Sequence, residues 1–265
     1  MKIQEWRRLA LCSVGLLTAV LLVSLTGMLH PLAGNNLSGE ENGTGTASER
    51  LQDIAHVEAH GRDENGPAVT QEPRRQYVVV IDAGHGGDDE GTGSTDWKYR
   101  EKDYALKVAD CLKEILDGTD IKAYYTRTDD REVSKEERVR LAKKVGADAL
   151  ISIHCNASDL NETTAKGVET LYSSRKATTK NGLSSKELAH NMLDAVCEMT
   201  GRQKRKVIRR DRLYLMHHAD MPVTIVEIGF MTNRSDMAYM KSEENQKAIA
   251  QGIYRGICTS FHLSE

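Results

Sequence analysis

The stretch that decides the fold is YVVVIDAGHGGDDEGTG, residues 77–93. Its four consecutive β-branched residues, Val78 to Ile81, predict a strand that is covered on both faces. His85 then lies just past the carboxyl end of this strand, in a turn rich in glycine. Functional sites of open α/β sheets form at that edge, and glycine lets a ligand or a metal approach the backbone. The turn alone leaves open whether His85 belongs to a site or is merely solvated.

Strands and helices alternate through the rest of the chain. We expect strands at residues 77–81, 121–127, 149–155, 167–173 and 223–230, and helices at 101–118, from 134 onward, 184–201 and 245–261. The helix after Ser134 is marked by a capping box with Glu137. Such alternation is typical of βαβ units. It predicts a doubly wound α/β fold, with a mostly parallel sheet and helices on both faces.

The N-terminal region predicts a membrane anchor. Lys2, Arg7 and Arg8 precede an apolar run over about residues 9–29, which at 1.5 Å per residue is long enough to cross a hydrocarbon core of about 30 Å. No clean small-x-small cleavage site follows, so we expect an uncleaved transmembrane signal anchor within residues 1–34, with the amino terminus in the cytoplasm. The expected location is the cell membrane, single-pass, with the folded domain outside; cleavage would give a secreted form.

The polar residues 35–76 predict a flexible linker, because they cannot bury enough apolar surface to offset the chain entropy. Residues 77–265 then form the folded domain. The net charge of −3 gives no electrostatic case for nucleic acid. The odd number of cysteines predicts free thiols and no disulfide framework, at Cys12, Cys111, Cys155, Cys197 and Cys258.

Two further polar segments each have two interpretations. The basic run at residues 202–212 is either a solvated surface or a surface that binds anionic polymers. His217 and His218 lie either in a solvated loop or along a groove.

Three predicted strands bring polar groups to the same edge of the sheet. His154 ends one strand and Glu227 lies near the end of another, each the lone ionisable group of a buried run. Burial of such a group is costly unless it is paired or binds a metal. With His85 they match the two histidines and one carboxylate of catalytic zinc sites, which leave a fourth position for water. Spacing leaves the third ligand open among Asp88, Asp89, Glu90, Glu101 and Glu227.

Five motifs occur in order along the folded domain: IDAGHGG, REKDYALKVA, ALISIHCNA, GVETLY and VTIVEIGFMTN. Together they resemble the zinc-dependent N-acetylmuramoyl-L-alanine amidases, the amidase_3 type of cell-wall hydrolase, over nearly all of residues 77–263. The resemblance implies that His85, Glu101 and His154 bind Zn²⁺ and that Glu227 is the catalytic acid/base. It also implies that Asp82 lies next to the metal turn and orients His85.

The implied activity is hydrolysis of peptidoglycan at the amide bond between N-acetylmuramic acid and L-alanine, by zinc-activated water. We expect a monomer that meets peptidoglycan while held to the membrane by its N-terminal helix. Two alternatives are another zinc-dependent wall hydrolase, such as a peptidase on stem peptides or cross-links, and a zinc-containing wall-binding module without activity. Short single-pass amidases of this kind also resemble those of sporulation and germination, and the sequence leaves that role open.

Overall fold

The structure is a computed structural model that describes residues 76–159, 163–177, 179 and 181–264. The predicted anchor, residues 35–75 of the predicted linker and Cys12 lie outside these described residues. Within them, none of the helices has the length and apolar character needed to span a membrane.

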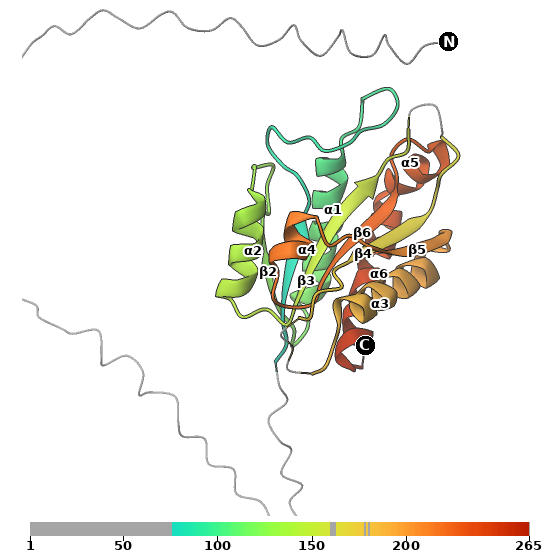
Figure 1. Cartoon of the computed structure of the whole chain (residues 1–265). Coiled ribbons are helices and arrows are strands. Elements are labelled where there is room, and N and C mark those ends of the chain that lie inside the picture. Colours follow the sequence, from blue (N-terminus) through green and yellow to red (C-terminus); the bar gives the residue numbers. More distant parts are fainter. Residues whose placement is uncertain (1–75, 160–162, 178, 180, 265) are drawn as a thin grey trace, which may run out of the picture. The chain divides into compact units, whose positions relative to one another are not determined.

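The described residues form one six-stranded sheet with the strand order β2-β1-β3-β6-β4-β5 (Figure 1). Neighbouring strands are parallel except for the antiparallel pair of β4 and β6. The predicted mostly parallel sheet is therefore confirmed. The strands are β1 (Val78–Ala83), β2 (Lys122–Tyr125), β3 (Ala149–Asn156), β4 (Val168–Tyr172), β5 (Lys204–Arg209) and β6 (Val223–Phe230).

Helices cover both faces of this sheet, as predicted. They are α1 (Glu101–Leu116), α2 (Lys135–Lys144), α3 (Ser185–Thr200), α4 (Tyr214–His218), α5 (Arg234–Met240) and α6 (Glu243–Phe261). Helices α1, α3 and α6 contribute to one buried apolar cluster, and α2 and α4 contribute to a second. The strands supply both clusters, because alternate side chains point to opposite faces: Ile151 and Ile153 belong to the first, and Leu150 belongs to the second.

The strand order places the carboxyl ends of β1, β3 and β6 side by side, since these three strands are neighbours. His154 of β3 is aligned with Glu227 of β6. The predicted meeting of polar groups at one sheet edge is therefore confirmed.

The capping box predicted at the start of α2 is also present: Ser134 Oγ accepts a hydrogen bond from the Glu137 backbone, and Glu137 Oε2 accepts one from the Ser134 backbone.

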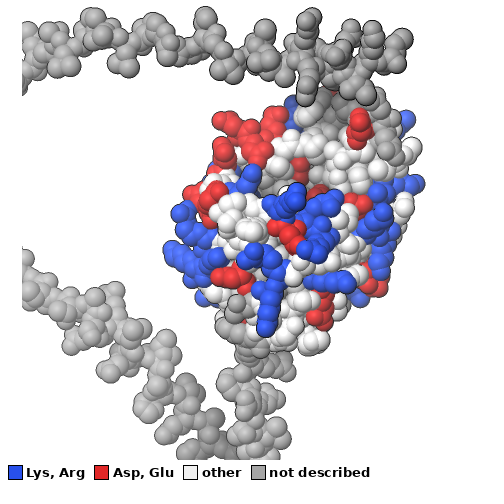
Figure 2. Space-filling model, viewed as in Figure 1, with Lys and Arg blue, Asp and Glu red and all other residues white. Residues whose placement is uncertain are grey.

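The basic run at residues 202–212 contains the edge strand β5, which the sequence did not predict. Charged side chains suit an exposed edge because they discourage pairing with another chain. Lys204 forms an ion pair with Asp194, and Arg209 forms one with Asp211. Figure 2 shows Lys and Arg side chains mixed with acidic ones on the face that it displays. Much of the positive charge is therefore neutralised locally.

Candidate metal centre

The glycine-rich turn after β1 puts His85 in a left-handed backbone conformation. His85 has φ 58°, and Gly86 and Gly87 follow with φ 126° and 60°. Such a conformation is uncommon and strained for a non-glycine residue. Gly84 is required for a different reason: a Cβ there would lie 2.4 Å from Cε1 of His154. The turn thus brings the β1 backbone directly against the second histidine.

Glu101 lies between the two histidines, at the first position of α1. Its Oε1 is 2.8 Å from Nδ1 of His154, and its Oε2 is 3.1 Å from Nε2 of His85. The same carboxylate accepts hydrogen bonds from the backbone N–H groups of Cys155 at 3.0 Å and Thr92 at 2.8 Å. One ligand atom from each of His85, Glu101 and His154 lies within 4.8 Å of the others. These three residues could therefore hold a metal ion.

The charges at this cluster are strongly coupled. Burial would raise the pKa of Glu101, but hydrogen bonds and charge interactions with His154 and His85 hold it well below its usual value. Burial would lower the pKa of His154, but the hydrogen bond and charge of Glu101 outweigh it and raise the pKa to about 9. Because a metal binds neutral imidazole, metal uptake has to displace protons here.

Glu227 lies beside this cluster, and its pKa is shifted in the opposite direction to that of Glu101. It is aligned with His154 on one side and with Glu169 on the other. Burial raises the pKa of Glu227 to about 7, since the opposing effect of His154 is partly cancelled by the carboxylates of Glu101 and Glu169. Its buried Oε2 has no hydrogen-bond partner among the described residues. A carboxyl group with such a pKa can both accept and donate a proton near neutral pH.

Glu169 differs from Glu227 although both are carboxylates aligned on neighbouring strands of the same sheet. Its oxygens accept hydrogen bonds from Asn156 Nδ2 at 2.9 Å and from Arg205 Nε at 2.6 Å. The charge of Glu169 is therefore paired, whereas Glu227 Oε2 is left for another partner.

A cavity of about 240 Å³ opens next to the cluster, on the side of α2 and α4. Its walls include His85, Asp89, His154, Leu213 and Tyr214. A larger hollow of about 850 Å³ lies between the loop at 94–99 and α5, and neither histidine of the cluster lines it. Of these two cavities within the described residues, the smaller one adjoins the candidate metal centre.

The other acidic candidates from the sequence lie outside the three-residue cluster. Asp89 Oδ2 is 2.9 Å from Nδ1 of His85, on the other side of the imidazole from Glu101. Glu90 forms an ion pair with Arg100 at 2.7 Å, and Asp88 is exposed. The structure brings together His85, Glu101 and His154, the set that the resemblance implied.

Asp82 does not contact the His85 side chain directly. It is fully buried, and its carboxylate accepts hydrogen bonds from Thr126, Ser152 and Arg138. The expected orienting effect on His85 is therefore indirect, through Arg138.

The remaining expectations concern cysteines and the histidine pair. Cys155 packs into the core on the face opposite His154, with its sulfur 3.9 Å from that of Met240. His217 and His218 are exposed on α4 and do not line the cavity beside the cluster. None of the described cysteines forms a disulfide bond, as predicted for Cys111, Cys155, Cys197 and Cys258.

Sequence reasoning missed three charged residues around the cluster, namely Glu169, Arg127 and Arg138. Glu169 gave the same signal as Glu227, because it is the lone carboxylate of an apolar strand. Arg127 ends the segment IKAYYTR, where a cation at the carboxyl end of a predicted strand was a weaker signal of the same kind.

The mostly parallel α/β sheet thus carries at its carboxyl edge two histidines and a carboxylate that could hold a metal ion, beside a separate glutamate, an arrangement typical of metal-dependent hydrolases. The sequence profile of the N-acetylmuramoyl-L-alanine amidases matches residues 79–259. The chain belongs to this family and is an N-acetylmuramoyl-L-alanine amidase, an enzyme that acts on peptidoglycan.

Individual relatives and a solved structure are similar to this chain over most of its described residues. The chain is 33% identical to the uncharacterized protein YqiI of Bacillus subtilis over 190 residues, which cover 72% of this chain and 87% of YqiI. It is 29% identical to the probable cell wall amidase LytH of Staphylococcus aureus over 70% of this chain and 58% of LytH. Its structure resembles that of an N-acetylmuramoyl-L-alanine amidase from Clostridium difficile 630, with a TM-score of 0.65, 34% identity, and coverage of 72% and 99%.

Proposed function

We propose that the enzyme is zinc-dependent, with His85, Glu101 and His154 as the zinc ligands and Glu227 as the catalytic acid/base. The observation that carries this proposal is the Glu101 carboxylate, which lies between the two imidazoles at 2.8 and 3.1 Å. Two imidazole nitrogens and one carboxylate oxygen form a donor set that suits zinc and leaves room for water. The family is one of amidases, so the scissile bond is the amide between N-acetylmuramic acid and L-alanine.

An amide is a poor electrophile and resists attack by neutral water. When bound, a zinc ion supplies two effects: it polarises a carbonyl and lowers the pKa of water from 15.7 to about 7. Glu227 accepts the proton of the attacking water at its free Oε2 and then donates it to the departing nitrogen. Burial raises the pKa of Glu227 above the usual value of a glutamate, which suits both steps, and such acid/base help accelerates a reaction about 10²- to 10⁴-fold.

The two glutamates have different roles because their surroundings differ. Glu101 is held as an anion by two histidines and two backbone N–H groups, which suits a permanent metal ligand. Glu227 has a buried Oε2 that lacks a hydrogen-bond partner among the described residues, which suits a group that changes its protonation. The assignment follows this contrast.

The reaction is tested by mass analysis of peptidoglycan digested with the full-length protein, with and without a chelator. We expect intact stem peptides with a free amino-terminal L-alanine, and no such release after chelation. Cut stem peptides or cross-links would instead indicate a wall peptidase. Release that is unaffected by the chelator would contradict the metal dependence.

We also propose that residues 1–34 anchor the enzyme in the cell membrane and that residues 35–76 tether the catalytic domain, 77–265, outside the cytoplasm. The support is the charge before the apolar run and the polar composition of the tether. The full-length protein should fractionate with membranes as a monomer. Recovery of a soluble form beginning near residue 30, or of a stable dimer, would contradict the corresponding part of this proposal.

A further inference from the structure

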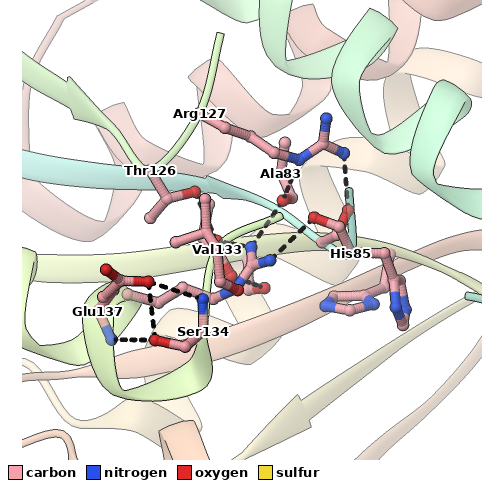
Figure 3. A network of polar contacts seen from close by, with 12 residues as sticks. Ala83, His85, Thr126, Arg127, Val133, Ser134 and Glu137 are labelled. Atoms are coloured by element: carbon pink, nitrogen blue, oxygen red, sulfur yellow. Dashed lines mark hydrogen bonds and ion pairs between the residues drawn. The ribbon is translucent and has the colours of Figure 1, made fainter. Parts of the chain in front are cut away.

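Two buried arginines hold the backbone of the turn that carries His85 (Figure 3). Arg127 Nε donates to the carbonyl of Ala83 at 3.0 Å, and its Nη2 donates to that of Gly84 at 2.7 Å. Arg138 Nη1 donates to the carbonyl of Ala83 at 2.7 Å, and its Nη2 donates to that of His85 at 2.8 Å. Three successive carbonyls are therefore bound by guanidinium groups.

This arrangement compensates for the unusual conformation of the turn. The left-handed backbone at His85 turns the chain away from the regular hydrogen bonding of β1. Buried carbonyl groups need donors, and the planar fork of a guanidinium supplies several in fixed directions. Arg127 and Arg138 are 1% and 5% exposed, so solvent competes little for these hydrogen bonds.

Arg127 also joins the turn to the helix of the second ligand. Its Nη2 donates to the carbonyl of Lys102 at 2.8 Å, and Lys102 follows Glu101 in the first turn of α1. The hydrogen bonds of Arg127 within the described residues all go to backbone carbonyls. Burying a cation among carbonyls is costly. Arg127 therefore contributes the fixed directions of its N–H donors to the site, and not a charge partner for an acidic residue.

Arg138 joins the same turn to the strand of the third ligand. It forms a buried ion pair with Asp82, and Asp82 Oδ2 accepts a hydrogen bond from Ser152 Oγ. Ser152 lies two residues before His154 on β3, on the same face of the sheet. The chain of contacts from Arg138 through Asp82 to Ser152 therefore fixes His85 relative to His154.

We propose that Arg127 and Arg138 are positioning residues that set the metal affinity of the enzyme, by fixing the backbones that carry the three ligands at one spacing. Arg127 fixes His85 relative to Glu101, and Arg138 fixes His85 relative to His154. This inference rests on the proposed metal site, because the two arginines act on the metal only through its ligands.

The test is the Arg127→Lys variant of the full-length protein. Lysine keeps the positive charge but replaces the planar fork with a single ammonium group. The Zn²⁺ dissociation constant, measured by competition with a chromophoric chelator, should rise about 10- to 100-fold, as for other residues that orient metal ligands. The matched control is Arg140→Lys on α2, whose side chain is 70% exposed and whose affinity should equal that of the wild type.

A purely structural role of Arg127 is distinguished from a positioning role by also measuring the unfolding midpoint of each metal-free variant. Ile257→Val removes a methylene group from the buried core, on α6, a helix that carries none of the proposed ligands; it should lower the unfolding midpoint without changing the Zn²⁺ affinity. Wild-type Zn²⁺ affinity in Arg127→Lys would overturn the inference. Arg138→Lys provides the same test if Arg127→Lys does not fold.

The proposed function fails in a different way from this inference. If the wild-type protein bound no Zn²⁺, or if His85→Ala bound it normally, the metal site itself would be wrong. If the wild type bound Zn²⁺ through His85 and both arginine variants bound it equally well, only the positioning role would be wrong.

Discussion

Gly84→Ala should disable the metal centre through a steric effect alone. A Cβ at this position would lie 2.4 Å from Cε1 and 2.5 Å from Nε2 of His154. Carbon atoms in contact prefer a separation of about 3.5–4.0 Å, so the imidazole has to move by about 1 Å or the β1 backbone has to shift. The φ of Gly84 is not in the left-handed region, so alanine meets no backbone strain of that kind.

The displacement acts on a side chain whose Nδ1 is 2.8 Å from Glu101. A misplacement of about 1 Å at a catalytic site can cost about 10²-fold in rate, and we expect a loss of at least that size in kcat/KM. Zn²⁺ affinity should fall as well, because His154 is a proposed ligand. Both quantities are measured on the full-length protein, by turnover of a muramoyl-peptide and by chelator competition.

Gly118→Ala is the matched control. It makes the same substitution after α1, where the added Cβ would lie 3.6 Å from the carbonyl oxygen of Ile115, an ordinary contact. This variant should keep wild-type activity and affinity. If Gly84→Ala also kept both, the close packing of His154 against the turn would not matter for the site, and the reasoning would be refuted.

Three other predictions concern the same site. Activity should decline toward acid pH with a midpoint at or below about 7, because Glu227 has to be unprotonated to accept a proton and a bound cation lowers the pKa of Glu227 below its metal-free value. A rate that is flat between about pH 5 and 8 would contradict this role. His85→Ala and His154→Ala should each lose both bound metal and activity, and full metal occupancy in either variant would remove that residue from the ligand set. Asp82→Asn should destabilise the protein by about 3–5 kcal/mol in thermal or chemical unfolding, because it leaves the buried Arg138 without its charge partner; wild-type stability would show that the pair is not needed.

The sequence predicted the strands that build the site because their apolar runs are nearly continuous. In β1, Val79, Val80 and Ile81 are all fully buried, as a strand covered on both faces requires. His154 and Glu227 were visible for the same reason: each is a lone ionisable residue in such a run. Their alignment on neighbouring strands follows from the parallel pairing of β3 and β6.

Short or charged elements gave no such signal. Strand β5 reads KRKVIR, and it forms because it pairs with β4 at the sheet edge, a contact that local sequence does not encode. Helices α4 and α5 have five and seven residues, too few for a helical period to be seen. The sequence analysis therefore did not predict β5, α4 and α5, which lie at the periphery of the fold.

The composition of the site was only partly predictable. Spacing could not select Glu101 from its acidic neighbours, because its place between the histidines depends on how α1 meets the edge of the sheet. Arg127 and Arg138 could not be found by charge pairing, because most of their acceptors are backbone carbonyls. Carbonyl positions depend on backbone conformation, which becomes known only with the fold.

The most direct test of the central claim compares the metal content and turnover of Glu101→Gln and Glu227→Gln. Glutamine is close in size to glutamate but offers a metal a neutral oxygen, and it cannot act as a proton acceptor at neutral pH. The account predicts that Glu101→Gln loses most of its zinc, whereas Glu227→Gln keeps zinc and fold but loses about 10²- to 10⁴-fold in rate. If Glu227→Gln lost zinc while Glu101→Gln retained it, the ligand and the acid/base would have to be exchanged.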